Sequence, residues 1–400
     1  MLLTRFTRLF AYGALSVVLV FYLTDLGFNT SQVGLLLTLT LIGDTIVSLF
    51  LTTQADRIGR RRMLLLGAVL MIAAGALFAV TRNFPLLVVV ATIGVISPSG
   101  NEVGPFLPIE QAALAHVVPA RLRTSVFAWY TLTGALATAA GSLTGGVISH
   151  RFQYRAVVLL YAALGAVLFI FFTQLSPAAE VTAVSEKSFL GIGKSRTIVL
   201  KLSALFALDS FGGGFVVQSF AAYWFFLRFG VTPETLGAIF FGANILAGIS
   251  ALLASRLAAR FGLVNTMVFT HLPSNLLLIL VPLMPTLPLA VLVLFARFSI
   301  SQMDVPTRQS YVMAVVRPEE RSAAAGVTGV ARTTGAALAP MFAGVLFSRP
   351  ALINAPFFIA GLLKIIYDLW LYRSFSSVQV RHEHEPSAPE HRDDRSRPSL

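Results

Sequence analysis

Eight charged side chains lie inside stretches of the sequence that are otherwise almost wholly apolar. A carboxylate in such surroundings can take up and release a proton or bind a cationic group, and a guanidinium group can bind an anion or neutralise a carboxylate. A charge at the centre of an apolar helix costs about 2.5 to 3.5 kcal/mol on insertion scales, so each side chain should face protein or water. We take them as candidates for binding protons or a solute: Asp44, Glu102, Glu110, Asp209, Arg297, Asp304, Arg308 and Arg332.

Glu102 is the first candidate for carrying a proton. It lies near the middle of the apolar stretch 84–117, which contains no Lys or Arg. Removal from water disfavours the charged form of a carboxyl group, so Glu102 should bind a proton readily.

For the other acids, internal pairing is an equal alternative. Asp304 and Arg308 are four residues apart on one helical face and could neutralise each other. Asp44 could take Arg332 as a partner and serve a structural role.

These residues must be positioned by helices that cross a membrane. Hydrophobic residues make up 56% of the 400 residues, and the mean hydropathy is +0.79, more than the core of a water-soluble protein requires. The apolar stretches suit a layer about 30 Å thick and lack the two-residue alternation of barrel strands. We predict an all-α polytopic membrane protein with twelve transmembrane helices, near residues 9–25, 33–54, 63–81, 84–117, 124–149, 155–174, 198–227, 235–258, 263–284, 287–316, 322–347 and 352–373.

The net charge of +12 is explained by orientation in the membrane. In a twelve-helix arrangement, 21 of the 30 Lys and Arg residues fall on the side of the two chain termini and five on the other side. Because basic residues are enriched in cytoplasmic connections, we expect both termini in the cytoplasm and the protein in the inner (plasma) membrane. Nucleic acid is not needed as a partner to explain the charge.

The two halves of the chain resemble each other at low identity. A shift of 203 residues aligns Gly34 with Gly237, and a shift of 198 aligns Gly146 with Gly344. We therefore predict two pseudo-symmetric six-helix bundles. Their expected bounds are a first bundle at 1–174, a cytoplasmic linker at 175–197, a second bundle at 198–373 and a disordered cytoplasmic tail at 374–400.

The repeat also aligns Glu110 with Arg308. Each follows a proline by two residues, Pro108 and Pro306 respectively. Pseudo-symmetry would place the two on facing gates near the cytoplasmic end. We expect these opposite charges to pair when the cytoplasmic side closes and to separate when it opens.

Two of the predicted helices contain residues that interrupt a helix. Prolines 98, 105 and 108 lie in the stretch 84–117, and glycines 212–214 follow Asp209 in the seventh helix. Broken helices at membrane depth occur where they line a cavity, so we expect these two helices to be moving parts.

A polar segment between the second and third predicted helices carries a known motif. The segment "TTQADRIGRRR" resembles the signature loop of the major facilitator superfamily, G-x-x-x-D-R-x-G-R-R, with the first glycine replaced by Thr52. The resemblance extends over residues 1–373 and implies a secondary transporter that works by alternating access. In the family this loop stabilises the outward-facing arrangement. The alternative is that its arginines only fix the orientation of the protein and contact lipid, and we favour this alternative for Arg62. The matching residues are Asp56, Arg57, Gly59, Arg60 and Arg61.

The fifth predicted helix resembles the glycine-rich antiporter motif of the same family. Gly141, Gly145 and Gly146 match the motif, while its proline is replaced by Ser142 and appears at the repeat-equivalent Pro340. The resemblance favours export, although small residues four apart also serve ordinary helix packing. Proton-driven drug exporters of the family carry an arginine in the fourth helix. This chain lacks that arginine, so it departs from the exporters' pattern.

No catalytic or cofactor-binding pattern competes with this interpretation. The chain contains no Cys, which excludes disulfides and thiol catalysis, and it lacks the G-x-x-x-x-G-K-S/T loop that binds nucleotide phosphates. His116 and His271 lie far apart in the sequence, and a metal site needs more ligands. We expect no cofactor and no enzymatic activity. An intramembrane enzyme would need a nucleophile and base that we do not find, and a membrane sensor would need a soluble output domain larger than the tail.

We therefore predict a monomeric secondary carrier that exports a small molecule in exchange for protons, with proton-coupled uptake as the alternative. Its expected partners are the solute, protons and the lipid bilayer. An apolar cavity with a few acids would suit cationic or amphipathic solutes, whereas an exposed Arg308 or Arg297 would suit anions. The sequence leaves these two solute classes open.

Overall fold

The computed structural model describes residues 1–102, 104–176, 195–317 and 320–375, and every regular element within them is a helix. Most of the predicted linker and nearly all of the predicted tail lie outside the described residues, as do the side chains of Asp56, Arg57 and His116. The helices of the first half are α1 (Leu2–Asp25), α2 (Thr30–Ile58), α3 (Arg60–Val80), α4 (Phe84–Ile93), α5 (Phe106–Val117), α6 (Ala120–Phe152) and α7 (Tyr154–Thr173). The helices of the second half are α8 (Arg196–Gly214), α9 (Gln218–Phe229), α10 (Pro233–Phe261), α11 (Leu263–Leu280), α12 (Leu287–Ser301), α13 (Asp304–Val315), α14 (Arg321–Phe347) and α15 (Ala355–Phe375).

Local sequence explains where several helices begin and end. At the start of α2 the side chain of Asn29 accepts the backbone amide of Gln32 at 2.9 Å, and the side chain of Gln32 accepts the amide of Asn29 at 3.0 Å. This reciprocal cap satisfies two amides that the helix leaves without partners. The chain turns into α3 at Gly59, with φ 113°, and into α11 at the repeat-equivalent Gly262, with φ 84°. Only glycine adopts such values without strain.

Within the described residues, eleven helical stretches are long and apolar enough to cross a membrane. They coincide with eleven of the twelve predicted helices. The remaining one, 84–117, is divided into α4 and α5, and neither part alone has the length of a membrane span. The all-helical membrane fold is therefore confirmed, while the count of twelve stays a prediction.

The first helix differs from the prediction at its start. It begins at Leu2, whereas the apolar pattern predicted a start near residue 9. Four residues of this added segment are buried in the bundle, Thr4, Arg5, Thr7 and Arg8, whereas Leu2, Leu3 and Phe6 are exposed. Two arginines that the sequence presents as flanking charges, Arg5 and Arg8, thus belong to the interior of the protein.

Three helices of the predicted set are broken near their middle. The fourth is interrupted by a loop at 94–105, the seventh at 215–217 between α8 and α9, and the tenth at 302–303 between α12 and α13. The first two breaks confirm the prediction from the prolines and glycines, whereas the third was not predicted. The first two also meet, because the amide and the hydroxyl of Ser219 donate to the carbonyl of Pro98 at 3.2 and 2.5 Å. The broken helices of the two halves are thus joined at the centre of the bundle.

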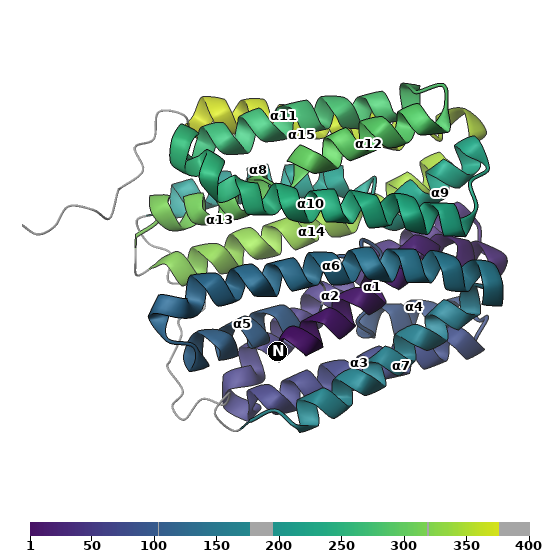
Figure 1. Cartoon of the computed structure of the whole chain (residues 1–400), viewed down its shortest axis with the longest axis horizontal. Coiled ribbons are helices and arrows are strands. Elements are labelled where there is room, and N and C mark those ends of the chain that lie inside the picture. The colour runs from purple at the N-terminus through teal and green to yellow at the C-terminus, as the bar shows by residue number, and fades with distance from the viewer. Residues whose placement is uncertain (103, 177–194, 318–319, 376–400) are drawn as a thin grey trace, which may run out of the picture.

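The two halves lie side by side and pack alike (Figure 1). Helix α1 packs on α6 as α8 packs on α14, and α3 packs on α7 as α11 packs on α15. Two further pairs, α2 with α14 and α6 with α10, join one half to the other. The sequence repeat therefore corresponds to a repeat in packing.

Glycines set the distance at the two crossings between the halves. A Cβ added to Gly34 of α2 would lie 2.9 Å from the Cα of Gly344 in α14, and one added to Gly146 of α6 would lie 2.9 Å from the Cα of Gly237 in α10. These distances are shorter than any real carbon contact, so only glycine permits the crossings. The four glycines are the same ones that the sequence repeat aligns.

The bundle has two distinguishable ends. The connections after α2, α5, α10 and α13 lie at one end, which we call the basic end because Arg60, Arg61, Arg317 and Arg321 lie there. The connections after α1, α3, α6, α9 and α14 lie at the opposite end.

Candidate functional site

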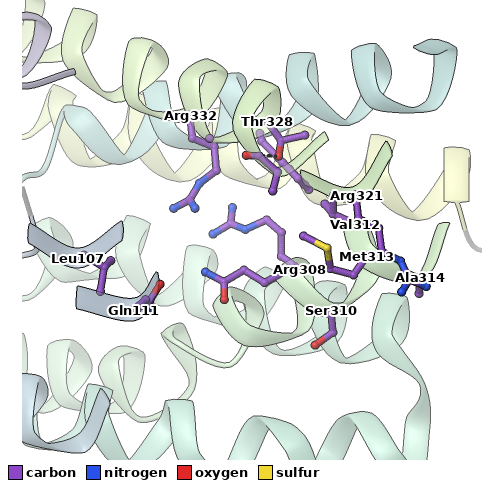
Figure 2. A pocket seen from close by; sticks show the side chains of 14 residues that line it. Leu107, Gln111, Arg308, Ser310, Val312, Met313, Ala314, Arg321, Thr328 and Arg332 are labelled. Carbon is purple, nitrogen blue, oxygen red and sulfur yellow. Dashed lines mark hydrogen bonds between the residues drawn. The ribbon is translucent and has the colours of Figure 1, made fainter. Parts of the chain in front are cut away.

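A cavity of about 800 Å³ lies between the two halves toward the basic end. The first half contributes Leu107 and Gln111 from α5, and the rest of the wall comes from α8, α13 and α14 (Figure 2). Three guanidinium groups line the wall, those of Arg308, Arg321 and Arg332. Its volume is in the range of pockets that bind small organic molecules.

The opposite end of the bundle is closed by contacts between the halves. The ring of Phe21 in α1 lies 5.6 Å from that of Tyr223 and 5.3 Å from that of Phe226, both in α9. Deeper in the bundle, the side-chain amide of Gln218 donates to the hydroxyls of Ser16 at 2.9 Å and Ser142 at 3.1 Å. Together with the glycine crossings, these contacts lie between the cavity and the opposite end of the bundle.

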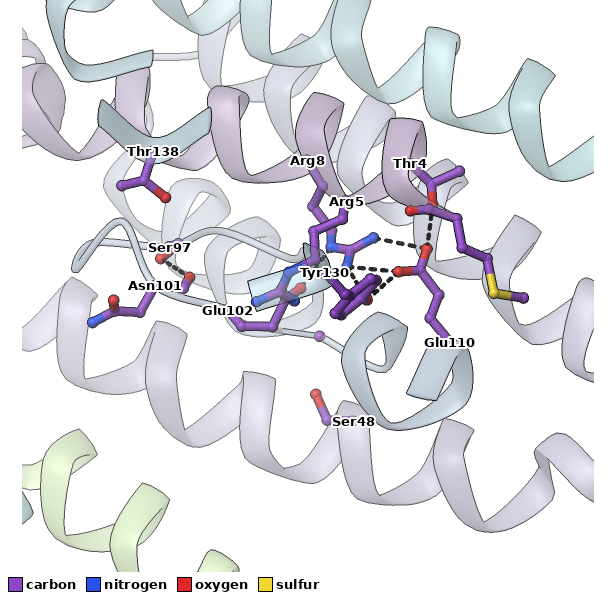
Figure 3. Close-up of polar contacts among 12 residues, drawn as sticks. Thr4, Arg5, Arg8, Ser48, Ser97, Asn101, Glu102, Glu110, Tyr130 and Thr138 are labelled. Atoms are coloured by element: carbon purple, nitrogen blue, oxygen red, sulfur yellow. Dashed lines mark hydrogen bonds and ion pairs between the residues drawn. The ribbon is translucent and has the colours of Figure 1, made fainter. Parts of the chain in front are cut away.

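A buried ion cluster lies beside the cavity in the first half (Figure 3). Arg8 of α1 donates through both terminal nitrogens to the carboxylate of Glu110, each at 3.1 Å, and through Nε to Glu102 at 2.5 Å. Arg5 binds the second oxygen of Glu102 at 2.5 Å. The side chains of Arg8 and Glu110 are fully buried and that of Glu102 is 12% exposed. Two cations thus face two carboxylates.

Hydroxyl groups complete the surroundings of Glu110. Thr4 donates to one of its oxygens at 2.6 Å and Tyr130 donates to the other. The guanidinium of Arg8 also lies over the ring of Phe106, at 4.8 Å from its centroid. A carboxylate with four donors around it is held in one orientation.

The second half contains a larger cluster. Arg308 of α13 donates to Asp209 of α8 at 2.9 Å and pairs with Asp304 at 3.1 Å, one helical turn before it. Lys364 of α15 donates to the other oxygen of Asp209 at 2.6 Å. Asp368 of α15 is bound at 2.8 Å by His271 and also at 2.8 Å by Asn275, both from α11.

The structure brings some of the predicted site residues together and separates others. Asp304 and Arg308 form the internal pair that was the alternative for them. Glu110 and Arg308, expected to pair when the cytoplasmic side closes and to separate when it opens, are not in contact in this arrangement, and each is held by partners within its own half. Glu102, which has no basic neighbour in its own predicted helix, is held by two arginines of the first helix.

Asp44 is the predicted acid without a cationic partner among the described residues. Its carboxylate accepts the amide of Gly104 at 2.6 Å and the hydroxyl of Ser48 at 3.3 Å. The expected pairing with Arg332 is absent, and Arg332 instead lines the cavity. Asp44 is thus tied to the loop that breaks the fourth helix, close to Glu102.

Arg297 of α12 has a buried Nε with no hydrogen-bond partner, and its guanidinium lies 5.0 Å from the ring centroid of Phe298. It adds a positive charge near the second cluster without joining its hydrogen bonds. Oxygen and nitrogen atoms of Asp209, His271 and Asp304 come within 4.8 Å of one another, as in a metal site. The ammonium of Lys364 and the guanidinium of Arg308 already bind the two aspartates, so we assign no metal to them.

The predicted gating loop is described in part. Gly59 makes the turn between α2 and α3, Arg60 is buried, and Arg61 donates to the carbonyl of Phe172 at 3.2 Å and to that of Thr173. Arg61 thereby fixes α3 to the end of α7. The predictions for Asp56 and Arg57 fall outside the described side chains.

The predicted packing motif lies at close helix contacts. A Cβ on Gly141 or Gly145 of α6 would meet the backbone of α1, and Gly146 is one of the crossing glycines described above. The carbonyl of Pro340 in α14 faces Gly34 of the other half.

Sequence reasoning missed several members of the two clusters. Arg5 and Arg8 precede the apolar pattern of the first predicted helix and therefore look like flanking charges, and Lys364 has no acidic residue before it within its own predicted helix. The signal for Lys364 and Asp368 was their spacing of four residues in an apolar stretch, the same spacing that singled out Asp304 and Arg308.

Comparison with known proteins agrees with this geometry. The family model described as Major Facilitator Superfamily matches residues 1–300 and 202–399. The chain is 30% identical over 418 residues to the uncharacterized membrane protein YJR124C of Saccharomyces cerevisiae, covering 94% of this chain and 93% of that one. It is 23% identical to the quinolone resistance protein NorA of Staphylococcus aureus, covering 87% and 88% of the two chains. The crystal structure of the nucleoside transporter NupG superposes with a TM-score of 0.73 at 17% identity, covering 94% of this chain and 98% of that one.

Proposed function

The chain belongs to the major facilitator superfamily of multi-pass membrane transporters, and from this premise we propose that it exports a small molecule in exchange for protons. The observation that carries the proposal is the cavity between two similarly packed halves, present toward the basic end and closed at the other. Closure of the halves at the basic end together with their separation at the glycine crossings would move the opening to the other end, which is alternating access.

The basic end is assigned to the cytoplasm of the plasma membrane. Connections rich in Lys and Arg stay on the cytoplasmic side, and the chain begins at this end of the bundle. With this orientation the cavity faces the cytoplasm, where an exporter takes up its solute.

Asp44 is the proposed proton carrier. Of the predicted acids in the described part of the chain, it alone faces no Lys or Arg, and its titratable neighbours are Glu102, Tyr12 and Tyr161. A partly buried carboxyl without a cation exchanges protons more easily than one held by two guanidinium groups. Because Asp44 accepts the amide of Gly104, its protonation would weaken a bond to the loop in the fourth helix. Proton binding would thereby loosen a part of the protein that contacts the second half.

The direction of transport is proposed as export on two grounds. The fifth helix carries the glycine-rich pattern at Gly141, Gly145 and Gly146, and the relative NorA is named for quinolone resistance. Proton-coupled uptake is the alternative that the same assay distinguishes.

Proteoliposomes with an imposed pH gradient test the proposal. Solutes from a screen should accumulate when the lumen is acidic, as proton exchange requires, and uptake by symport would instead need an acidic exterior. The variant Asp44→Asn keeps an oxygen that can accept the Gly104 amide but cannot bind a proton. We expect it to lose gradient-driven accumulation by more than tenfold while retaining solute exchange at equal pH.

The matched control is Asp25→Asn, which removes an exposed carboxylate at the opposite end of α1. It should transport like the wild type. Glu102→Gln and Glu110→Gln test the acids that the sequence favoured, and we expect losses in both accumulation and exchange because their arginine partners are left unpaired. Normal gradient-driven accumulation by Asp44→Asn would refute the proton assignment, and absence of flux for every solute would refute the transport proposal itself.

A further inference from the structure

The cavity wall carries positive charge that its own residues do not neutralise. Three of its lining residues are arginines, Arg308, Arg321 and Arg332, and none of the described lining residues is Asp or Glu. The carboxylates of Asp209 and Asp304 lie behind Arg308, buried away from the cavity at 4% exposure each. A solute in the cavity therefore meets guanidinium groups first.

The charges around this wall are also unequal in number. The second half holds three buried carboxylates in its cluster, those of Asp209, Asp304 and Asp368. Four cations accompany them in the described part of that half, namely Arg308 and Lys364 in direct contact and Arg297 and Arg332 close by. Among these seven residues the positive charges exceed the negative ones by one, with His271 counted as neutral. The cluster of the first half is balanced.

Arg332 is the group best placed to bind an anion. It projects from α14 toward the cavity, opposite Arg308 (Figure 2). Among the described residues it forms no ion pair, and its Nε is buried without a hydrogen-bond partner. The Nε of Arg308 is likewise unpartnered. Buried donors of this kind cost free energy until an acceptor reaches them, and a planar guanidinium suits the two oxygens of an oxyanion.

The remainder of the wall is largely apolar. Phe206, Val312, Met313 and Leu107 contribute side chains to it, so a ligand with a hydrocarbon or aromatic body fits beside the arginines. We propose that the cavity binds a small amphipathic organic anion, whose carboxylate, sulfonate or phosphate is held by Arg332. The inference names the solute class of the transporter proposed above and rests on that proposal, but binding can be measured without transport.

Two dyes of the same xanthene framework and opposite charge provide the test: fluorescein, an anion, and rhodamine 123, a cation. Their binding to the purified full chain in phosphatidylcholine nanodiscs is measured by fluorescence anisotropy at pH 8, with no pH gradient. We expect fluorescein to bind at least tenfold more tightly than rhodamine 123. The variant Arg332→Gln should weaken fluorescein binding by about tenfold and leave rhodamine 123 unchanged or bound more tightly, while Arg332→Lys should retain part of the affinity because it keeps the charge.

The matched control is Arg349→Gln, which removes an exposed arginine at the opposite end of the bundle and should not change binding. Tighter binding of rhodamine 123 than of fluorescein, or full fluorescein affinity in a folded Arg332→Gln protein, would overturn the inference. A lipid headgroup as the natural anion is tested by adding phosphatidylglycerol to the nanodiscs at equal salt; complete loss of fluorescein binding would contradict a soluble solute. Gradient-driven flux of a cationic solute without fluorescein binding would refute this inference and leave the proposed transport intact.

Discussion

Substitution of Arg8 by Met tests how strongly the buried charges of the first half depend on one another. Arg8 is fully buried, and its guanidinium group supplies three nitrogens to two carboxylates, at 2.5 Å to Glu102 and twice at 3.1 Å to Glu110. Methionine fills much of the same space beside Phe106 but carries no charge. Glu102 would keep Arg5 at 2.5 Å, whereas Glu110 would keep only the hydroxyls of Thr4 and Tyr130.

The expected cost follows from leaving one carboxylate buried without a cation. Removing one member of a buried ion pair destabilises a protein by about 3 to 5 kcal/mol, and the burial of Glu110 places Arg8→Met in that range. Neutralising Glu110 as well, in Arg8→Met/Glu110→Gln, should restore about 1 to 3 kcal/mol, because no orphaned charge remains. The double variant should thus be more stable than Arg8→Met alone.

Unfolding by sodium dodecyl sulfate in mixed micelles, followed by circular dichroism, measures these differences. The control is Arg82→Met, which removes an exposed arginine at the opposite end and should change the free energy of unfolding by less than about 0.5 kcal/mol. If Arg8→Met cost no more than Arg82→Met, or if the double variant cost the sum of the two single ones, the cluster would not be the coupled unit that its geometry indicates.

Two further predictions concern the movement of the halves. Gly34→Val should reduce transport by more than tenfold, because its side chain would strike the backbone of α14 at the closed end. The control Gly326→Val, at a position where an added Cβ meets nothing within 4 Å, should transport normally. Flux assays in proteoliposomes measure both variants, and an equal loss in the two would contradict the crossing as the cause. A protein in which Glu110 and Arg308 are exchanged for one another should transport as poorly as either single variant, because each residue has oppositely charged partners within its own half. Recovery of flux in the exchanged protein would instead indicate that the two residues pair directly in another state.

The positions of the helices follow closely from the sequence, and the reason is local. Apolar stretches of sufficient length must become helices in a membrane, because backbone groups there have no water to bind. Prolines and glycines locate the breaks in the fourth and seventh helices for equally local reasons. The break at 302–303 in the tenth helix escaped prediction because no glycine or proline lies at it, and the nearest proline, Pro306, follows it within α13.

The partners of the buried charges could not be predicted in the same way. Arg8 looks like an ordinary flanking residue, since its partner Glu110 is 102 positions away along the chain. Glu102 looks like a lone acid for the same reason. The pairing expected from the repeat when the cytoplasmic side closes, Glu110 with Arg308, stays a prediction for that state; in this arrangement each half supplies the partners of its own residue.

The sequence by itself determined the membrane-spanning class, the two similar halves, the family and the set of buried charged residues, because these depend on composition and on patterns within single helices. Only the tertiary structure decided which charges neutralise one another, which arginine remains for a ligand and at which end the cavity lies. Charges in an apolar interior select partners by distance in space, and the cavity depends on how closely the glycine crossings let the two halves approach.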